Sequence, residues 1–144
     1  EVEAMRARME ATATLANLKR GIGGTVDIEF CVQMLQLRYG LEFPDVLQPG
    51  TLNAISSLEE AKLLTSEDAE SLRSGYRLLR SVESRLRLLN TTARHDLPEK
   101  DGELDKLAYI LRSDDVASLQ RELASSRREN RRVFQATVAR LVAE

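Results

Sequence analysis

The chain has 144 residues, of which 31% are charged and 42% hydrophobic, a composition typical of a folded domain and not of a disordered segment. The formal net charge of -2 at pH 7 gives no overall attraction to nucleic acid or to an anionic membrane, and no apolar run approaches the ~20 residues that span a bilayer. The only cysteine, Cys31, cannot form an internal disulfide, which favours a reducing, cytoplasmic setting.

The first part of the chain indicates two helices separated by a glycine-rich break. A helix is predicted over residues 2–18, ending at Lys19 and Arg20, because cations suit the negative end of a helix dipole. The sequence Gly-Ile-Gly-Gly at 21–24 interrupts it. A second helix is then predicted over residues 25–39, ended by the glycine that follows.

The middle of the chain contains the longest regular apolar pattern. After a loop at 41–50, apolar residues spaced three apart predict a short helix over 51–62. Thr65 is predicted to cap a long helix that reaches Asn90. Its apolar stripe consists of Leu72, Tyr76, Leu79, Val82, Leu86 and Leu89.

The last part of the chain completes the prediction of an all-α fold. Residues 91–102 are predicted to be irregular, a short helix is predicted around 104–111, and Ser-Asp-Asp at 113–115 is predicted to cap a long last helix. We therefore expect a helix bundle of about five to six helices, forming a single domain over 1–144. The chain has no initiator methionine, so we expect a fragment of a longer protein.

The glycine-rich turn is the most unusual segment. Three glycines in four positions allow the backbone to adopt φ > 0 and to approach another group closely. They precede a helix N-terminus, where free N–H groups favour anions, and two cations lie beside them. The turn is therefore a candidate for contact with a nucleotide or with a neighbouring domain. The candidate residues are Lys19, Arg20, Gly21, Gly23, Gly24, Asp27 and Glu29.

Two acidic residues favour a different interpretation of this turn. Asp27 and Glu29 are about 200° apart on a helix, so they cannot both face one site. Either carboxylate would repel a phosphate unless Mg²⁺ lay between the carboxylate and the phosphate, or unless the carboxylate pointed away. A phosphate-binding glycine loop usually follows a strand, and none is predicted here. The alternative is a purely structural turn between two packed helices.

The segment KRGIGGTVDIEFCVQMLQL, which starts at Lys19, resembles the signature that opens the helical domain of the glutamine synthetase adenylyltransferases. Members of that family read approximately K-x-G-x-G-G-[I/L]-x-[D/E]-I-E-F-x-V-Q-x-x-Q-L, and the PII uridylyltransferases carry a related Gly-Gly-x-x-Asp element. Residues 76–86 and 95–98 are similar to the family's Y-x-x-L-R-x-x-E-x-R-L and T-H-x-L-P stretches. Thr25 departs from the aliphatic residue usual in the signature.

This resemblance implies a two-headed enzyme whose halves each pair a nucleotidyltransferase domain with a helical domain. It implies that the chain is a C-terminal fragment of this larger enzyme, with the helix over residues 1–20 leading in from the catalytic domain before it. One head attaches AMP from ATP to a tyrosine of glutamine synthetase, and the other removes it by phosphorolysis, under the control of PII signalling protein and glutamine. The implied partners are glutamine synthetase, PII and the preceding nucleotidyltransferase domain, and the implied cofactors of the parent enzyme are ATP and Mg²⁺.

The sequence lacks the Gly-Ser and Asp-x-Asp elements with which such transferases hold Mg²⁺. We therefore expect no catalytic residue, metal site or cofactor in this chain, and no transferase activity from it alone. Two alternatives stay open. One is a non-catalytic regulatory bundle that relays PII or glutamine signals, and the other is a relative of the PII uridylyltransferases.

Glu83, His95 and Cys31 are residue types that often have a functional role, but each has a simpler structural interpretation here. Glu83 falls on the apolar stripe of the long helix, so it is expected to pair with an arginine three or four residues away. His95 is the only histidine, with Asp96 as its obvious local partner, and a loop-organising hydrogen bond is expected in place of a metal site. Cys31 is predicted to be a core thiol.

The last helix is rich in arginine. The simplest interpretation is a solvated face, and the sharper one is a docking surface for a neighbouring domain or a protein partner. The docking candidates are Arg127, Arg128, Arg131 and Arg132.

Overall fold

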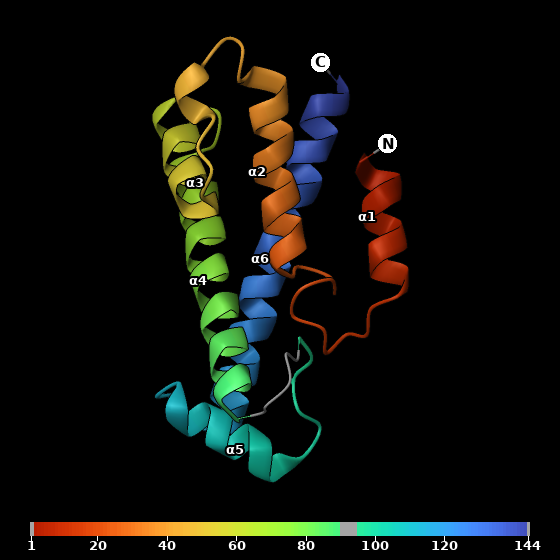
Figure 1. Ribbon diagram of the computed structural model, residues 1–144, viewed down its shortest axis with the longest axis vertical. Helices are drawn as coiled ribbons and strands as arrows, with labels where there is room; N and C mark the ends of the chain where they lie inside the picture. Colours follow the sequence, from red (N-terminus) through yellow and green to blue (C-terminus); the bar gives the residue numbers. More distant parts are fainter. Residues whose placement is uncertain (1, 90–94, 144) are drawn as a thin grey trace.

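The computed structural model describes residues 2–89 and 95–143, and these form the predicted all-α bundle (Figure 1). No helix among the described residues is both long and apolar enough to cross a membrane. The elements are α1 (Val2–Ala11), α2 (Thr25–Tyr39), the 3-10 helix η1 (Pro44–Val46), α3 (Thr51–Glu60), α4 (Ser66–Leu89), α5 (Asp101–Ile110) and α6 (Val116–Ala143).

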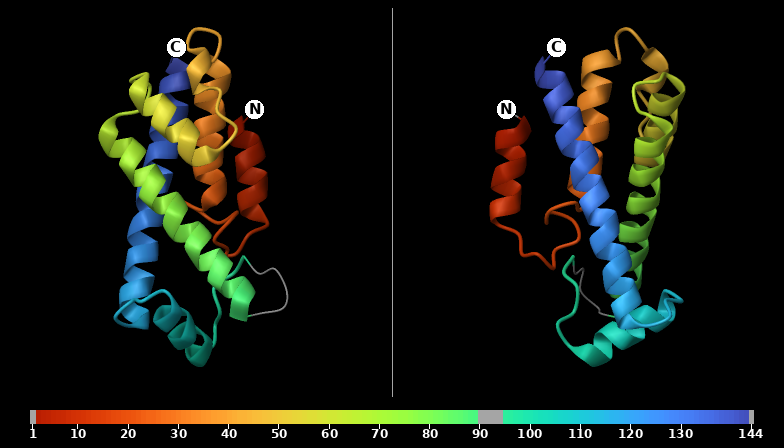
Figure 2. Two further views of the ribbon diagram at one scale, coloured as in Figure 1. Left: turned by 60° about the vertical axis from the view of Figure 1, so that its left-hand side comes forward. Right: turned by 180° about the vertical axis from the view of Figure 1, so that it is seen from behind.

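The two longest helices, α4 and α6, run along each other and form the spine of the bundle (Figures 1 and 2). Helix α2 packs on α6, α3 packs on α4, and α5 lies across the end of the pair. Their facing apolar stripes exclude water from one continuous core, which is the main stabilising term of such a bundle. The core side chains include Ile28, Cys31, Leu35, Ile55, Leu58, Leu72, Leu79, Val82, Leu86, Leu119, Leu123, Val133 and Phe134.

Both predicted helix caps are confirmed by hydrogen bonds. The backbone N–H of Asp68 donates to Oγ1 of Thr65 over 3.1 Å, at the start of α4. The backbone N–H of Ser118 donates to Oδ1 of Asp115 over 2.6 Å, at the start of α6. Each cap satisfies a donor that the first turn of a helix leaves free, so these residues fix where the long helices begin.

The prediction of a helix over 2–18 is wrong beyond Ala11, where α1 ends. Other hydrogen bonds compete for the backbone that follows. The side-chain oxygen of Asn17 accepts from the N–H groups of Lys19 and Arg20, over 3.1 and 2.7 Å. The N–H of Leu18 donates to the carbonyl of His95 over 2.6 Å, in a short bridge between two distant segments. These bonds hold the backbone out of a helix.

Two further boundaries differ from the prediction. Helix α3 ends at Glu60 because Lys62 adopts a positive φ of 58°, which a helix does not tolerate. Helix α5 begins at residue 101, so residues 101 and 102, which were predicted to be irregular, are helical. Residues 90–94, which include the predicted end of the long helix, lie outside the described residues.

The predicted core thiol is confirmed. Cys31 is fully buried on α2, and its Sγ lies 3.2 Å from Oγ1 of Thr137 on α6. Burial raises the pKa of the Cys31 thiol to about 11, so the thiol stays protonated at neutral pH. A buried and protonated thiol is a poor nucleophile.

Helix α1 stands apart from the bundle (Figures 1 and 2). Arg6 is the one α1 residue that is buried, and α1 has no apolar stripe that could hold it to α6. Its attachment therefore depends on polar contacts near the glycine-rich turn.

Candidate functional site

The glycine-rich turn at 21–24 is held by side chains of α6. Nε of Arg127 donates to the carbonyl of Ile22 over 2.8 Å, and Nη1 donates to the carbonyl of Leu15 over 2.7 Å. Nδ2 of the buried Asn130 donates to the carbonyl of Gly23 over 3.0 Å. Burial lowers the pKa of Arg127, an effect that the charge of Asp27 opposes. The turn is thus pinned to α6 by its carbonyl groups.

Gly23 is a glycine for two physical reasons. Its φ of +68° lies in the left-handed region that other residues rarely adopt. In addition, a Cβ at this position would collide with the carbonyl of Arg127. The turn therefore lies in direct backbone contact with α6, and any side chain at this point would push the two apart.

Asp27 is fully buried at the centre of a network of ion pairs and hydrogen bonds. One of its carboxylate oxygens accepts from Nε of Arg6, and the other accepts from the N–H of Gly23 over 2.7 Å. Arg131 of α6 approaches the same carboxylate at 3.4 Å and pairs with Glu10 of α1 at 3.1 Å. A single carboxylate therefore joins α1, the turn, α2 and α6.

The N–H groups around the start of α2 are already used. The amides of Gly24, Thr25, Val26 and Asp27 donate to the carbonyls of Gly21, Leu18, Lys19 and Gly24 at 3.0–3.1 Å. Together with Gly23, whose N–H donates to Asp27, five successive donors are occupied. These five amides are therefore not free to bind a phosphate, and the buried Asp27 is already paired with Arg6. Contact of the turn with a nucleotide stays a prediction.

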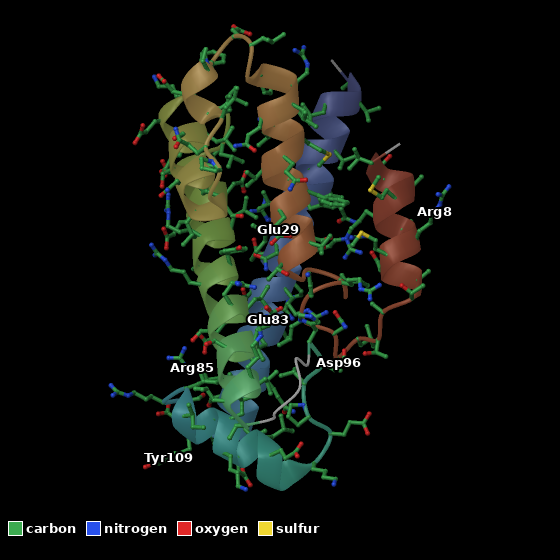
Figure 3. All side chains as sticks on the ribbon, in the orientation of Figure 1. Arg8, Glu29, Glu83, Arg85, Asp96 and Tyr109 are labelled. Carbon is green, nitrogen blue, oxygen red and sulfur yellow. The ribbon has the colours of Figure 1, made fainter. Side chains whose placement is uncertain are left out.

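Glu29 points the other way from Asp27, as the helical spacing predicts. It is half-buried, and its charged neighbours are Lys19, Arg80 and Glu83. Figure 3 labels Glu29 on α2 and Glu83 on α4. Burial raises the pKa of Glu29, Lys19 and Arg80 lower it, and the negative charge of Glu83 raises it further. The two acidic residues of α2 therefore belong to two different polar clusters.

Glu83 pairs with Arg80, as expected from the sequence. It is buried, and its Oε2 accepts from Nη1 of Arg80 over 3.2 Å. Nδ1 of His95 lies 3.7 Å from the other oxygen, and neither of these two buried atoms has a hydrogen-bond partner among the described residues. The prediction that Asp96 is the partner of the His95 ring is corrected, because the ring faces Glu83 and Asp96 accepts from Thr14 over 3.4 Å.

The four arginines predicted to form a docking surface have different positions. Arg127 and Arg131 fold inward onto the turn and Asp27. Arg132 pairs with Asp68 of α4 at 2.7 Å and with Glu129 at 2.8 Å. Arg128 is exposed and makes no ion pair among the described residues. Three of the four arginines therefore have intramolecular partners, and docking through these residues stays a prediction.

Of the turn candidates, the structure brings together Gly21, Gly23, Gly24 and Asp27, whereas Lys19 and Arg20 are exposed beside them. Sequence reasoning missed Arg6 and Asn130. Arg6 is 21 residues from Asp27, and no local spacing connects them. An indirect signal was available for Arg6, because a helix without an apolar stripe needs a polar anchor. Within the described part of the chain, no group of three or more His, Cys, Asp or Glu side chains could hold a metal ion.

Comparison with known proteins gives consistent matches. The family model described as GlnD PII-uridylyltransferase matches residues 1–138. The bifunctional glutamine synthetase adenylyltransferase/adenylyl-removing enzyme of Caulobacter vibrioides is 42% identical over 99 residues, which cover 69% of this chain and 10% of that protein. The enzyme of the same name from Mycobacterium avium is 37% identical over 147 residues, which cover 94% of this chain and 14% of that protein. The one from Streptomyces avermitilis is 34% identical over 128 residues, which cover 85% of this chain and 13% of that protein. The chain thus spans only 10–14% of the length of these relatives.

Asp27→Asn is expected to destabilise the domain by about 3 kcal/mol, because it leaves the buried Arg6 guanidinium without its carboxylate. The free energy of unfolding, measured by urea denaturation, tests this. The control is Asp105→Asn on the exposed face of α5, which should change stability by less than about 0.5 kcal/mol. Equal effects of the two substitutions would contradict a central role for Asp27.

Gly23→Ala is expected to cost about 2 kcal/mol or more, since alanine must adopt a positive φ against the Arg127 carbonyl. Thermal and urea unfolding measure the loss. Gly102→Ala is the matched control, because a Cβ there meets no atom within 4 Å and alanine favours the helix. A stable Gly23→Ala variant would show that the turn can leave α6.

Glu29→Gln is expected to stabilise the domain at neutral pH. The native pKa of Glu29 is raised above its ordinary value of 4.5, so ionisation of Glu29 lowers stability as the pH rises through that window. Below pH 4.5 both the folded and unfolded carboxyls are protonated, and the advantage of glutamine should vanish. Urea unfolding across this range tests the sign, with Glu60→Gln, which is exposed on α3, as the control. A pH-independent difference would contradict the assignment.

Proposed function

The chain belongs to the GlnD PII-uridylyltransferase family, and we propose that it is the helical domain of an enzyme that transfers AMP from ATP to a tyrosine of glutamine synthetase and also removes it. The observation that carries this proposal is the 42% identity to the Caulobacter vibrioides enzyme over 69% of the chain. In this proposal ATP and Mg²⁺ are bound by a nucleotidyltransferase domain that precedes the chain, and the enzyme acts in the cytoplasm with PII as a regulator.

In this activity the helical domain has a supporting role, because it holds the catalytic domain in position. The amides from Gly23 to Asp27 already donate within the protein, and the buried Asp27 is already paired, so these groups do not support nucleotide binding at the turn. The same contacts make the turn stiff, because it is fixed to α6 at its carbonyls and to α1 through Arg6. A stiff element of this kind can hold a catalytic domain in position, so catalytic residues are expected outside this chain.

A second candidate function is uridylyl transfer to PII. The observation that favours it is the family model, which is described as a PII-uridylyltransferase and matches residues 1–138. The two candidates differ in the nucleotide that is transferred and in the protein that accepts it, so one assay can separate them.

The test supplies the full-length protein that contains this chain with labelled ATP and glutamine synthetase, or with labelled UTP and PII, so that its own nucleotidyltransferase domain decides the outcome. We expect labelled AMP on glutamine synthetase and no labelled UMP on PII. UMP transfer to PII, with no AMP transfer, would support the second candidate instead.

The matched controls separate support from catalysis. The full-length protein with Gly23→Val should lose AMP transfer, since the turn can no longer lie against α6, whereas Leu41→Ser at a fully exposed loop position should keep it. The chain by itself should transfer no AMP to glutamine synthetase. Measurable transfer by the chain alone would contradict a purely supporting role.

A further inference from the structure

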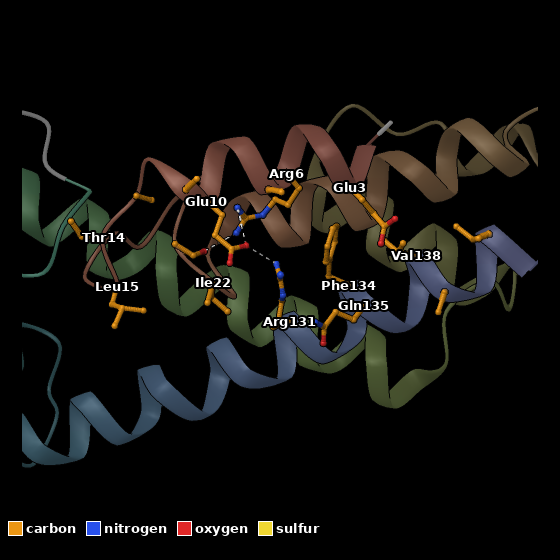
Figure 4. A pocket seen from close by; sticks show the side chains of 16 residues that line it. Glu3, Arg6, Glu10, Thr14, Leu15, Ile22, Arg131, Phe134, Gln135 and Val138 are labelled. Carbon is orange, nitrogen blue, oxygen red and sulfur yellow. Dashed lines mark hydrogen bonds and ion pairs between the residues drawn. The ribbon is translucent and has the colours of Figure 1, made fainter.

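Helices α1 and α6 frame a groove of about 750 Å³, which exists because α1 is held at a distance by its polar anchor (Figure 4). The ion pairs of Arg6, Glu10 and Arg131 close it on one side. Its lining is otherwise mainly apolar. The apolar lining includes Ala7, Ala11, Ile22, Phe134, Val138 and Val142.

A second hollow of about 640 Å³ continues this groove along α6. Leu15 and Ile22 line both hollows and are 79% and 42% exposed, so two apolar side chains stand in water where the hollows meet. Exposed apolar side chains that border a concave surface are typical of a binding site. The two hollows together are called the α1–α6 groove below.

The second hollow differs from the first in charge. Four arginines and a single glutamate, Glu129, line it, whereas two arginines and two glutamates line the first. Arg127 donates to carbonyl groups, so no carboxylate neutralises it directly, and Arg128 is exposed without an ion pair among the described residues. Arg131 and Arg132 already have carboxylate partners, so Arg127 and Arg128 are the arginines of this hollow that could attract a further carboxylate. The α1–α6 groove is therefore apolar at one end and carries these two cations at the other.

We propose that the α1–α6 groove binds an amphipathic helix of a protein partner, with its apolar stripe over Phe134 and Val138 and its carboxylates facing Arg128. The lining residues of α6 run from Ala124 to Val142, which at 1.5 Å per residue is about 27 Å and matches a helix of about 18 residues. A concave groove with an apolar floor fits a helix. A flat bilayer surface would not reach Phe134, which is buried on that floor.

The test uses the whole chain and a synthetic 18-residue peptide with leucines at helical spacing, glutamates at one end and a single tryptophan in its apolar stripe. The chain contains no tryptophan, so the fluorescence of the peptide reports its own burial. We expect saturable binding with a blue shift. The same peptide with lysine at every glutamate position should bind at least about tenfold more weakly.

Variants of the chain locate the peptide. Arg128→Glu and Leu15→Ser should each weaken binding by about fivefold or more, since they remove the charge and the apolar contact of the groove. Arg121→Glu on the exposed part of α6 and Leu41→Ser in an exposed turn are the matched controls and should leave binding unchanged. Circular dichroism confirms that each variant is folded.

Three results would overturn the proposal. The first is no saturable binding of the glutamate peptide, and the second is equal binding of the glutamate and lysine peptides. The third is binding of the chain to phosphatidylserine vesicles that Arg128→Glu and Leu15→Ser abolish while peptide binding is unaffected. That last outcome would assign the groove to a membrane surface.

Discussion

The buried carboxylate of Asp27 is the interaction on which the rest of this structure depends. A charge that is removed from water must be paired, and here the pairing partners come from three separate segments, namely α1, the glycine-rich turn and α6. Each partner satisfies the carboxylate only if its own segment is in place. The carboxylate therefore fixes where the first helix lies, how closely the turn approaches α6, and which face of α2 looks inward.

This constraint also decides what the turn can do. Three glycines before a helix are compatible with anion binding, but an anion needs free N–H groups, and every donor from Gly23 to Asp27 is already occupied. The negative charge that a helix N-terminus attracts is thus supplied from within, by Asp27 itself. The segment that resembles the adenylyltransferase signature therefore connects helices of the fold to one another. Glu29, on the opposite face of α2, belongs to a separate polar cluster with Arg80 and Glu83.

The parts of the fold that sequence predicts well are those governed by local rules. Apolar spacing predicts α3 and α4, glycines on either side predict α2, and the side chains of Thr65 and Asp115 predict where α4 and α6 begin. The failures have a non-local cause. The helix predicted over 2–18 ends early because Leu18 bonds to His95, 77 residues away in sequence, and the Arg6–Asp27 pair likewise has no local signature. The α6 arginines show the same limit, since Arg127 differs from Arg128 only in what the fold brings near it.

The polar anchor of α1 has a consequence for the motions of the domain. Since Arg6 is the one buried residue of this helix, α1 can open without exposing the core shared by α4 and α6. Its backbone amides are then expected to exchange with solvent through local opening, at a free energy below that of global unfolding. The domain thus consists of a cooperative bundle and of helix α1, which opens separately. The position of α1 controls the width of the α1–α6 groove.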